Sequence, residues 1–309
     1  MAVNLPPLPE LAPVPGVRLG VARAGVRQPD RDDLVVVEIP AGAAVAAVFT
    51  RNRFRAAPVR IAEAALAAAR DEGSAPRHLL INTGNANAGT GPAGHEAALA
   101  CCRAVADATG TRPEAVLPFS TGVIGEPLPA ERIAAAVPEA LADLSETGWA
   151  RAAGAILTTD TAPKGACVEL DGRSGHVTGI AKGAGMIRPD MATMLAFLAT
   201  DVPVRPRVLD ELLRRAVEAS FHRITVDGDT STNDAVTVLA TGAGEAIDDA
   251  DGPAGRALGA ALTAACVQLA RTIVRDGEGA TRFVSLEIGG ARDEAEALAC
   301  AFTIAQSPL

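Results

Sequence analysis

Apolar positions follow two different spacings along this chain. In several short stretches Val, Ile, Leu and Ala alternate with other residues or run together for a few positions, which is typical of half-buried or fully buried strands. These stretches predict strands over residues 17–26, 34–39, 45–50, 78–82, 115–118, 166–170, 176–180, 194–200, 224–226, 235–240 and 281–288.

Longer stretches place apolar residues three and four positions apart, which is the spacing of one face of a helix. They predict helices over residues 58–70, 94–109, 129–144, 149–157, 207–220, 255–275 and 292–304. Gly110 is the expected C-cap of the second helix, and Asp171-Gly172 is the expected turn of a hairpin. Residues 119–126 follow a short strand and are expected to form a loop.

The order of these elements indicates the fold class. Strands come in pairs and triples between pairs of helices, which favours an α+β arrangement of layers over strict βαβ alternation. The 309 residues are 49% hydrophobic but only 3% aromatic. Small Val and Ala side chains suit closely packed layers of helix and sheet, and this length can bury a substantial core.

Composition excludes several classes of function. A net charge of −9 and the lack of a basic run argue against a nucleic-acid surface. No uninterrupted apolar stretch of about 18 residues is present, so we expect no membrane span. The N-terminus does not resemble a signal peptide, and the five cysteines show no C-x-x-C spacing. These features favour a cytoplasmic protein without a disulfide framework or a metal site.

Five loops concentrate Gly, Thr, Ser, Asn and Asp, and such loops commonly carry binding and catalytic residues. They read TGNANAGT (83–90), STGVIG (120–125), TTDTAPK (158–164), DGDTSTND (227–234) and RDGEGAT (275–281). The spacing of Gly89, Gly91 and Gly94 matches a dinucleotide fingerprint, but no acidic residue ends a second strand at the required distance. The four histidines are isolated and predict neither a zinc site nor a Ser-His-Asp mechanism.

Two residue types in these segments point to specific chemistry. Of the 28 basic residues only Lys164 and Lys182 are lysines, and a compact ammonium differs chemically from a guanidinium. Thr193 opens an apolar strand shortly after Lys182. A threonine hydroxyl becomes a good nucleophile when a base lies beside it, and its own free α-amine, with a pKa of about 7.7–8.0, is such a base. That arrangement requires cutting the chain between Ala192 and Thr193.

The segment AKGAGMIRPDMATML (181–195) resembles the self-cleavage motif of the ornithine acetyltransferases, also called bifunctional glutamate N-acetyltransferases. The other loops, together with the final IAQSPL, follow in the order found in that family, so the resemblance runs from about Val17 to Leu309. It implies an α/β/β/α sandwich with helices outside two stacked sheets. It also implies self-cleavage into an α chain of residues 1–192 and a β chain of residues 193–309, which form one intertwined catalytic unit.

The resemblance also implies the roles of individual residues. Thr193 would be the nucleophile that takes the acetyl group, and Thr121 with Gly122 would form the oxyanion hole. Thr158, Lys182, Thr193 and Glu278 would contact the substrate. Because the TTDT run leaves the match uncertain by one position, Thr159 is an alternative to Thr158.

The activity implied by the resemblance is acetyl transfer from N-acetylornithine to glutamate through an acetyl-threonine, with acetyl-CoA as a second donor in bifunctional members. The expected assembly is a heterotetramer of two α and two β chains, with no metal or prosthetic group. Whether this chain is monofunctional or bifunctional stays open.

Two alternatives remain at this stage. An N-terminal-nucleophile amidohydrolase or aminopeptidase would use water in place of glutamate. A truncated, unprocessed and inactive chain is the other alternative, because the resemblance stops at Leu309 before a C-terminal segment that the family carries. On that ground we expect weak transfer from the chain as given.

Overall fold

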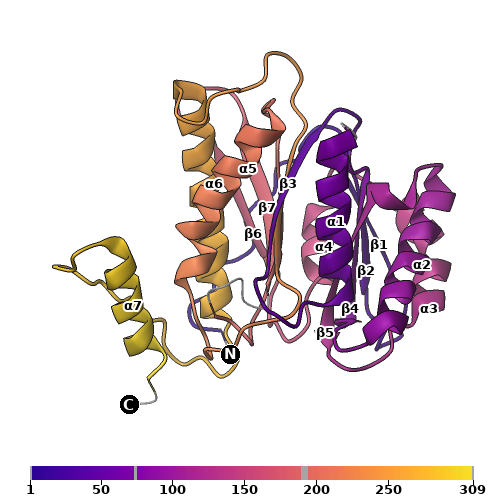
Figure 1. The fold of residues 1–309 in the computed structure, drawn as a ribbon, viewed down its shortest axis with the longest axis horizontal. Coiled ribbons are helices and arrows are strands. Elements are labelled where there is room, and N and C mark those ends of the chain that lie inside the picture. The colour runs from indigo at the N-terminus through magenta and orange to yellow at the C-terminus, as the bar shows by residue number, and fades with distance from the viewer. Residues whose placement is uncertain (1, 73–74, 189–193, 308–309) are drawn as a thin grey trace.

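Two β-sheets, described by a computed structural model for residues 2–72, 75–188 and 194–307, form the centre of the fold (Figure 1). The four-stranded sheet has the order β1 (Arg18–Ala22), β2 (Leu34–Glu38), β4 (His78–Asn85) and β5 (Val116–Val123). The five-stranded sheet has the order β3 (Ala44–Phe49), β9 (Ala235–Ala240), β8 (Leu195–Thr200), β7 (His176–Lys182) and β6 (Lys164–Glu169). Each sheet is mixed, with one parallel pair: β4 with β5, and β8 with β9.

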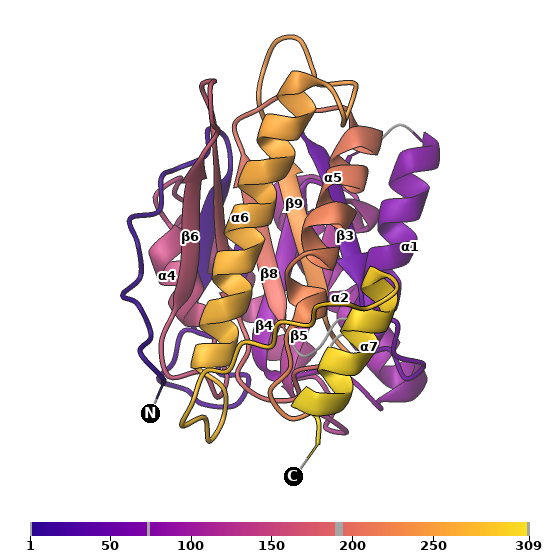
Figure 2. The ribbon, with the colours of Figure 1, turned by 90° about the vertical axis from the view of Figure 1, so that its left-hand side faces the viewer.

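Helices cover the outer face of each sheet. Helices α2 (Gly91–Thr109) and α3 (Ala130–Ala142) pack on the four-stranded sheet, and α5 (Pro206–Glu218) and α6 (Pro253–Arg275) pack on the five-stranded one (Figures 1 and 2). Helices α1 (Ala57–Glu72) and α4 (Trp149–Ala155) add side chains to the core between the sheets. The predicted α/β/β/α sandwich is therefore confirmed.

The strand sequences explain this layering. In β2, Leu34 and Val36 face the α2 and α3 side, while Val35 and Val37 face the other sheet. Successive side chains of a strand point to opposite faces, so a strand buried on both faces reads as a continuous apolar run. Between the sheets the rings of Phe119 and Phe197 meet edge to face, with centroids 5.1 Å apart.

Most predicted elements are found within a few residues of their expected ends. The hairpin of β6 and β7 forms across Gly172, and Gly110 closes α2 with a positive φ of 67°. Strand β5 is longer than predicted, because residues 119–123, expected to form a loop, pair in parallel with β4. Ser, Thr and Gly are turn formers by local preference, but here they extend the ladder at the ends of two parallel strands.

Two predicted strands are wrong. Residues 224–226 follow a 3-10 turn (Phe221–Arg223) and form no strand, although Val226 donates its N–H to the carbonyl of Ile187. Residues 281–288 also form no strand, and Val284 and Leu286 are 69% and 39% exposed. A segment with alternating apolar residues forms a stable strand only where another layer of the protein covers its apolar face. Within the described parts of the chain no such layer covers residues 281–288.

The C-terminal helices differ in their surroundings. Among the described residues α6 is the one helix long and apolar enough to span a membrane by those two measures, but half of its apolar window is buried in the fold. It serves as a covering layer of the five-stranded sheet (Figure 2). Every residue of α7 (Glu294–Ala305) is at least partly exposed, and the helix stands beside the sandwich rather than within its layers (Figure 1).

We expect Gly20→Ala to destabilise the fold by about 3 kcal/mol, because overpacking against backbone is poorly relieved. A Cβ at Gly20, in β1, would lie 1.9 Å from the carbonyl oxygen of Ala140 in α3. Gly154→Ala, inside α4 with no atom within 4 Å of the added carbon, is the matched control. It should raise stability by about 0.5–1 kcal/mol. Urea unfolding measures both, and a Gly20→Ala protein as stable as the parent would contradict the described packing of α3 on β1.

Candidate active site

A cavity of about 510 Å³ opens at one end of the sandwich. Five of the residues singled out from the sequence line it: Thr121, Gly122, Thr158, Lys182 and Glu278. Thr159, the alternative to Thr158, lines it as well, so both remain candidates. Ala192 and Thr193, and with them the predicted boundary between the two chains, lie outside the described residues.

The parallel pair of β4 and β5 forms one wall. Thr121 is in register with Thr83, and Gly122 with Gly84, just before the ladder becomes irregular at Asn85. Gly122 has a φ of 136°, and a Cβ there would lie 2.3 Å from the carbonyl carbon of Gly84. Glycine is therefore required at this position, where two backbones approach closely. The carboxyl ends of parallel strands are a common place for a ligand.

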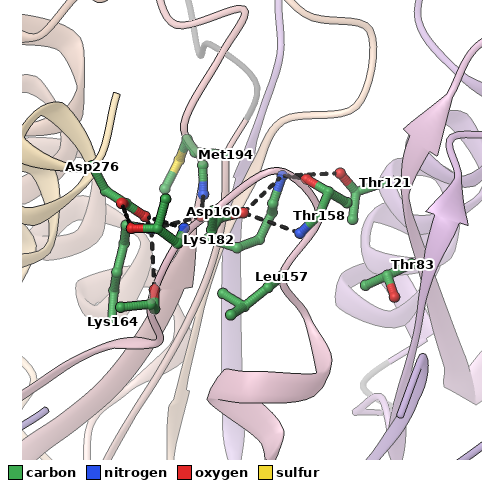
Figure 3. A network of polar contacts seen from close by, with 12 residues as sticks. Thr83, Thr121, Leu157, Thr158, Asp160, Lys164, Lys182, Met194 and Asp276 are labelled. Atoms are coloured by element: carbon green, nitrogen blue, oxygen red, sulfur yellow. Dashed lines mark hydrogen bonds and ion pairs between the residues drawn. The ribbon is translucent and has the colours of Figure 1, made fainter. Parts of the chain in front are cut away.

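Lys182 ends β7 and is almost completely buried. Its Nζ donates to Thr158 Oγ1 at 2.7 Å and to Thr121 Oγ1 at 3.3 Å, and it lies 3.8 Å from Asp160 Oδ2 (Figure 3). Burial lowers the pKa of Lys182, although the Asp160 carboxylate opposes that shift. An ammonium has only donors, so it binds the two hydroxyls as acceptors and leaves their own hydrogens free for other partners.

Asp160 lies behind Lys182, away from the cavity lining. It accepts hydrogen bonds from the backbone N–H of Gly183 at 2.6 Å and of Thr158 at 3.1 Å. Burial alone raises the pKa of this carboxyl, but the charges of Lys182 and Lys164 and the hydrogen bonds from Lys164 and the Gly183 N–H outweigh burial and hold the pKa at about 2. Asp160 is therefore a stable carboxylate that joins the segments carrying Thr158 and Lys182.

Glu278 approaches the cavity from the loop after α6. Its backbone N–H donates to the carbonyl of Ala184 at 2.7 Å. Its carboxylate lies over Gly185, since a Cβ at that glycine would be 2.6 Å from Glu278 Oε1. The cavity thus holds an ammonium on one side and a carboxylate on another, an arrangement that suits a molecule bearing both a carboxylate and an amine.

The DGDTSTND loop anchors the chain on both sides of residues 189–193. Asp227 accepts the N–H of Ile187 at 2.8 Å, and Asp234 accepts the N–H of Met194 at 2.9 Å. Asp234 is fully buried, and burial raises its pKa well above the ordinary value. Met194 also accepts a hydrogen bond from the N–H of Ala235 at 3.2 Å, so the first described residue after this gap is held at both its N–H and its carbonyl.

Sequence reasoning missed a further wall of the cavity, formed by Arg27, Gln28, Arg31 and Asp33. Asp33 accepts the N–H groups of Ala24 at 2.7 Å and Val26 at 2.6 Å. These bonds fix the loop that leads to the lining residues 27 and 28. No Gly-rich motif marks this wall in the sequence. A single acidic residue before a strand, such as Asp33, does not by itself indicate a binding site when only one sequence is considered.

The described residues contain no group of three or more His, Cys, Asp or Glu side chains arranged to hold a metal ion. Most of the cavity-lining residues are threonines, glycines and charged residues. Such groups suit the binding of an amino acid and the stabilisation of an oxyanion.

Comparison with known proteins gives a consistent result. The sequence model of the ArgJ family matches residues 18–309. The "Arginine biosynthesis bifunctional protein ArgJ" of Pseudomonas syringae pv. tomato is 52% identical over 313 residues, and that of Pseudomonas fluorescens is 50% identical. Each alignment covers 100% of this chain and 76% of the relative. Among solved structures, a chain of the ornithine acetyltransferase of Mycobacterium tuberculosis, in complex with ornithine, is 34% identical. It has a TM-score of 0.50 and matches 58% of this chain and 93% of its own length.

We expect Asp160 to make stability depend on pH below about pH 4. Its pKa in the folded chain, about 2, lies below the ordinary value of 3.8. The stabilisation is therefore complete above pH 4 and is lost as the pH falls through 2, by about 2 kcal/mol. Urea unfolding of the parent and of Asp160→Asn should show a stability difference that shrinks by this amount over that interval.

The control is Asp32→Asn, which removes a carboxylate paired at the surface with Arg23 and Arg151. Exposed pairs contribute little, so this change should cost no more than about 1 kcal/mol. A stability difference for Asp160→Asn that stays constant from pH 6 to pH 2 would contradict the charged, buried state of Asp160.

Proposed function

This chain belongs to the ArgJ family of arginine-biosynthesis acetyltransferases, and from this premise we propose how its cavity carries out acetyl transfer. Thr193, freed as an N-terminal residue by self-cleavage, takes the acetyl group of N-acetylornithine and passes it to glutamate. The observation that carries the proposal is that Thr121, Gly122, Thr158, Lys182 and Glu278 line one cavity. Strand β8 begins at Leu195, which is in register with the cavity residue Lys182 and follows Thr193 by two positions in the sequence.

Self-cleavage provides the base that the nucleophile needs. Hydrolysis of the peptide bond between Ala192 and Thr193 leaves a carboxylate on Ala192 and an α-amine on Thr193. An amine with a pKa near neutrality accepts the hydroxyl proton as the oxygen attacks a carbonyl. The solved ornithine acetyltransferase chain supports a cut. The match takes in 93% of that chain but only 58% of this one, so the solved chain is shorter than two thirds of the length of this one. Residues 1–192 would also make a chain shorter than two thirds of this length.

The first transfer uses the Thr193 hydroxyl as the nucleophile and two fixed donors for the oxyanion. The Thr193 oxygen attacks the acetyl carbonyl, and the resulting oxyanion accepts hydrogen bonds from Thr121 Oγ1 and the N–H of Gly122. The contact from Lys182 supports this role of Thr121, because it uses a lone pair of Thr121 Oγ1 and leaves the hydroxyl hydrogen available. Collapse of the intermediate breaks the carbon–nitrogen bond, and the departing amine of ornithine takes the proton held by the α-amine.

The second transfer reverses these steps with glutamate. Its α-amine attacks the acetyl-threonine ester, the same two donors hold the oxyanion, and Thr193 regains its hydroxyl. Lys182 pairs with the α-carboxylate of either amino acid, with Thr158 or Thr159 beside it. Glu278 pairs with the side-chain ammonium of ornithine. One cavity thus accepts both substrates in turn, as a ping-pong reaction requires.

Several broader expectations belong to the same proposal. The reaction needs no metal or prosthetic group, because the α-amine and the oxyanion donors provide the acid-base and electrostatic steps. Acetyl-CoA is the second acetyl donor if the chain shares the bifunctional activity for which its relatives are named. We propose a heterotetramer of two chains of residues 1–192 and two of residues 193–309, in the cytoplasm.

We expect the purified chain to cut itself between Ala192 and Thr193. Mass analysis should find a fragment that begins at Thr193, and Thr193→Ala should remain a single chain because it lacks the hydroxyl. Thr193→Ser keeps the hydroxyl and should still be cut. Thr263→Ala, which removes a hydroxyl bonded to the carbonyl of Gly259 within α6, is the control and should be cut like the parent. Recovery of the parent as one intact chain after long incubation would refute the cleavage.

Acetyl transfer is tested by incubating the cleaved protein with N-acetylornithine in the presence and absence of glutamate. Without glutamate we expect about one ornithine released per site, because the acetyl-enzyme has no acceptor. With glutamate, release should continue and N-acetylglutamate should accumulate in equal amount. Sustained ornithine release without glutamate would instead identify an N-terminal-nucleophile amidohydrolase, in which water is the acceptor.

A further inference from the structure

Four buried charges alternate in sign from the cavity inward: Lys182, Asp160, Lys164 and Asp276 (Figure 3). Lys164 begins β6, is 1% exposed and does not line the cavity. It is the other lysine, besides Lys182, among the 28 Lys and Arg residues of the chain. The proposed reaction assigns it no part, and yet a buried ammonium is retained in the structure only where it is well paired.

Lys164 is fully paired. Its Nζ lies 2.6 Å from Asp160 Oδ1 and 2.6 Å from Asp276 Oδ2, and it donates a third, longer bond of 3.4 Å to the carbonyl of Ala162. Three acceptors around one nitrogen match the three donors of an ammonium. The planar fork of Arg is larger and fixed in direction, so it does not fit this arrangement.

The short bond to Lys164 leaves Asp160 with less hydrogen-bonding capacity for Lys182. Oδ1 of Asp160 is taken by Lys164 and the N–H of Gly183, and Oδ2 accepts the N–H of Thr158. Lys182 is left 3.8 Å from Asp160, and its own short contacts are to Thr158 and Thr121 on the cavity side. Its ammonium is therefore near a carboxylate but directed toward the cavity.

The other end of the charge chain reaches the loop that carries Glu278. Asp276 closes α6, accepts the N–H of Thr161 at 2.9 Å and also bonds the Thr161 hydroxyl. Glu278 follows two residues later. Through Asp276, Lys164 connects the segment that carries Thr158 to the segment that carries Glu278.

We propose that Lys164 is a positioning residue: by engaging Asp160 and Asp276 it keeps the ammonium of Lys182 turned toward the cavity and available to the carboxylate of the substrate. The purpose assigned to Lys182 rests on the proposed function, but the competition between two lysines for Asp160 does not. Without Lys164, Asp160 would have one cation left to pair with, and Lys182 would move toward it.

The charges around Lys182 determine the direction in which its pKa should change when Lys164 is removed. Asp160, Asp234 and Glu278 favour its protonated form, whereas burial and the positive charge of Lys164 lower its pKa. Arg27, Arg31 and Asp33 are the other charged residues among those that line the cavity. Removing Lys164 takes away a repulsive charge and releases an attractive one, so Lys182 should hold its proton to higher pH.

The test uses Lys164→Met combined with Asp276→Asn, because the single change would leave a buried carboxylate unpaired and endanger folding. The double variant removes one positive and one negative charge, so the buried cluster stays neutral. With no lysine added in a tag, the parent labelled with ¹³C at lysine Cε gives two resonances. The double variant gives one, from Lys182, whose titration is then read directly by nuclear magnetic resonance.

We expect the Lys182 titration of the double variant to move to higher pH, and the KM of both amino-acid substrates to rise about tenfold, the effect of losing one charged hydrogen bond. Asp276→Asn alone is the matched control. It leaves Lys164 wholly to Asp160 and should not move the Lys182 titration upward.

A folded double variant whose Lys182 titrates at the same pH as in the parent, or lower, would overturn the proposal. So would an equal upward shift in Asp276→Asn alone, since Lys164 is still present there. The resonance is measured without substrate. A protein that transfers no acetyl group would therefore refute the proposed function while leaving this test of Lys164 valid.

Discussion

The site depends on holding the ammonium of Lys182 inside the protein without binding it fully to a carboxylate. A buried charge needs a counter-charge, but an ammonium locked to a carboxylate has little left to offer a substrate. The structure meets both needs because Asp160 lies 3.8 Å from Lys182, while the closest contacts of Asp160 itself are with Lys164 and with backbone amides. Lys182 is then stabilised electrostatically while its hydrogen bonds go to two hydroxyls at the cavity.

The fold brings these groups together because of where its strands begin and end. The cavity lies where β4, β5 and β7 end, so that residues from distant parts of the chain meet there. Strands β8 and β9 begin beside the end of β7, since Leu195 is in register with both Lys182 and Ala235. Lys164 begins β6 in register with Ala181, one residue before Lys182. The two sheets are buried on both faces and pack as rigid layers, so the ends of their strands are fixed. The loops that join these strand ends are thereby held in place as well.

The sequence allowed much of this architecture to be predicted, and the reasons are visible in single elements. β2 is apolar from Leu34 to Val37 and β8 from Leu195 to Ala199, because each faces a core on both sides. The five cavity residues lie in segments rich in small and polar residues, some at the ends of strands β5 and β7 and some in loops. The predicted strand at 281–288 failed because alternation describes a side-chain pattern and not the layer needed to cover it. The roles of Asp160, Asp276 and Asp33 were missed, since a carboxylate that bonds backbone amides looks the same in sequence as one that faces water.

The central claim is that Thr193 carries the acetyl group between the two substrates. The most direct measurement is mass analysis of the protein mixed with N-acetylornithine alone, stopped in acid and digested. We expect a single added acetyl group on the peptide that begins at Thr193, removed when glutamate is present before the stop. An acetyl group found on another residue such as Lys182, or no acetylated peptide in a protein that still transfers acetyl to glutamate, would contradict the account.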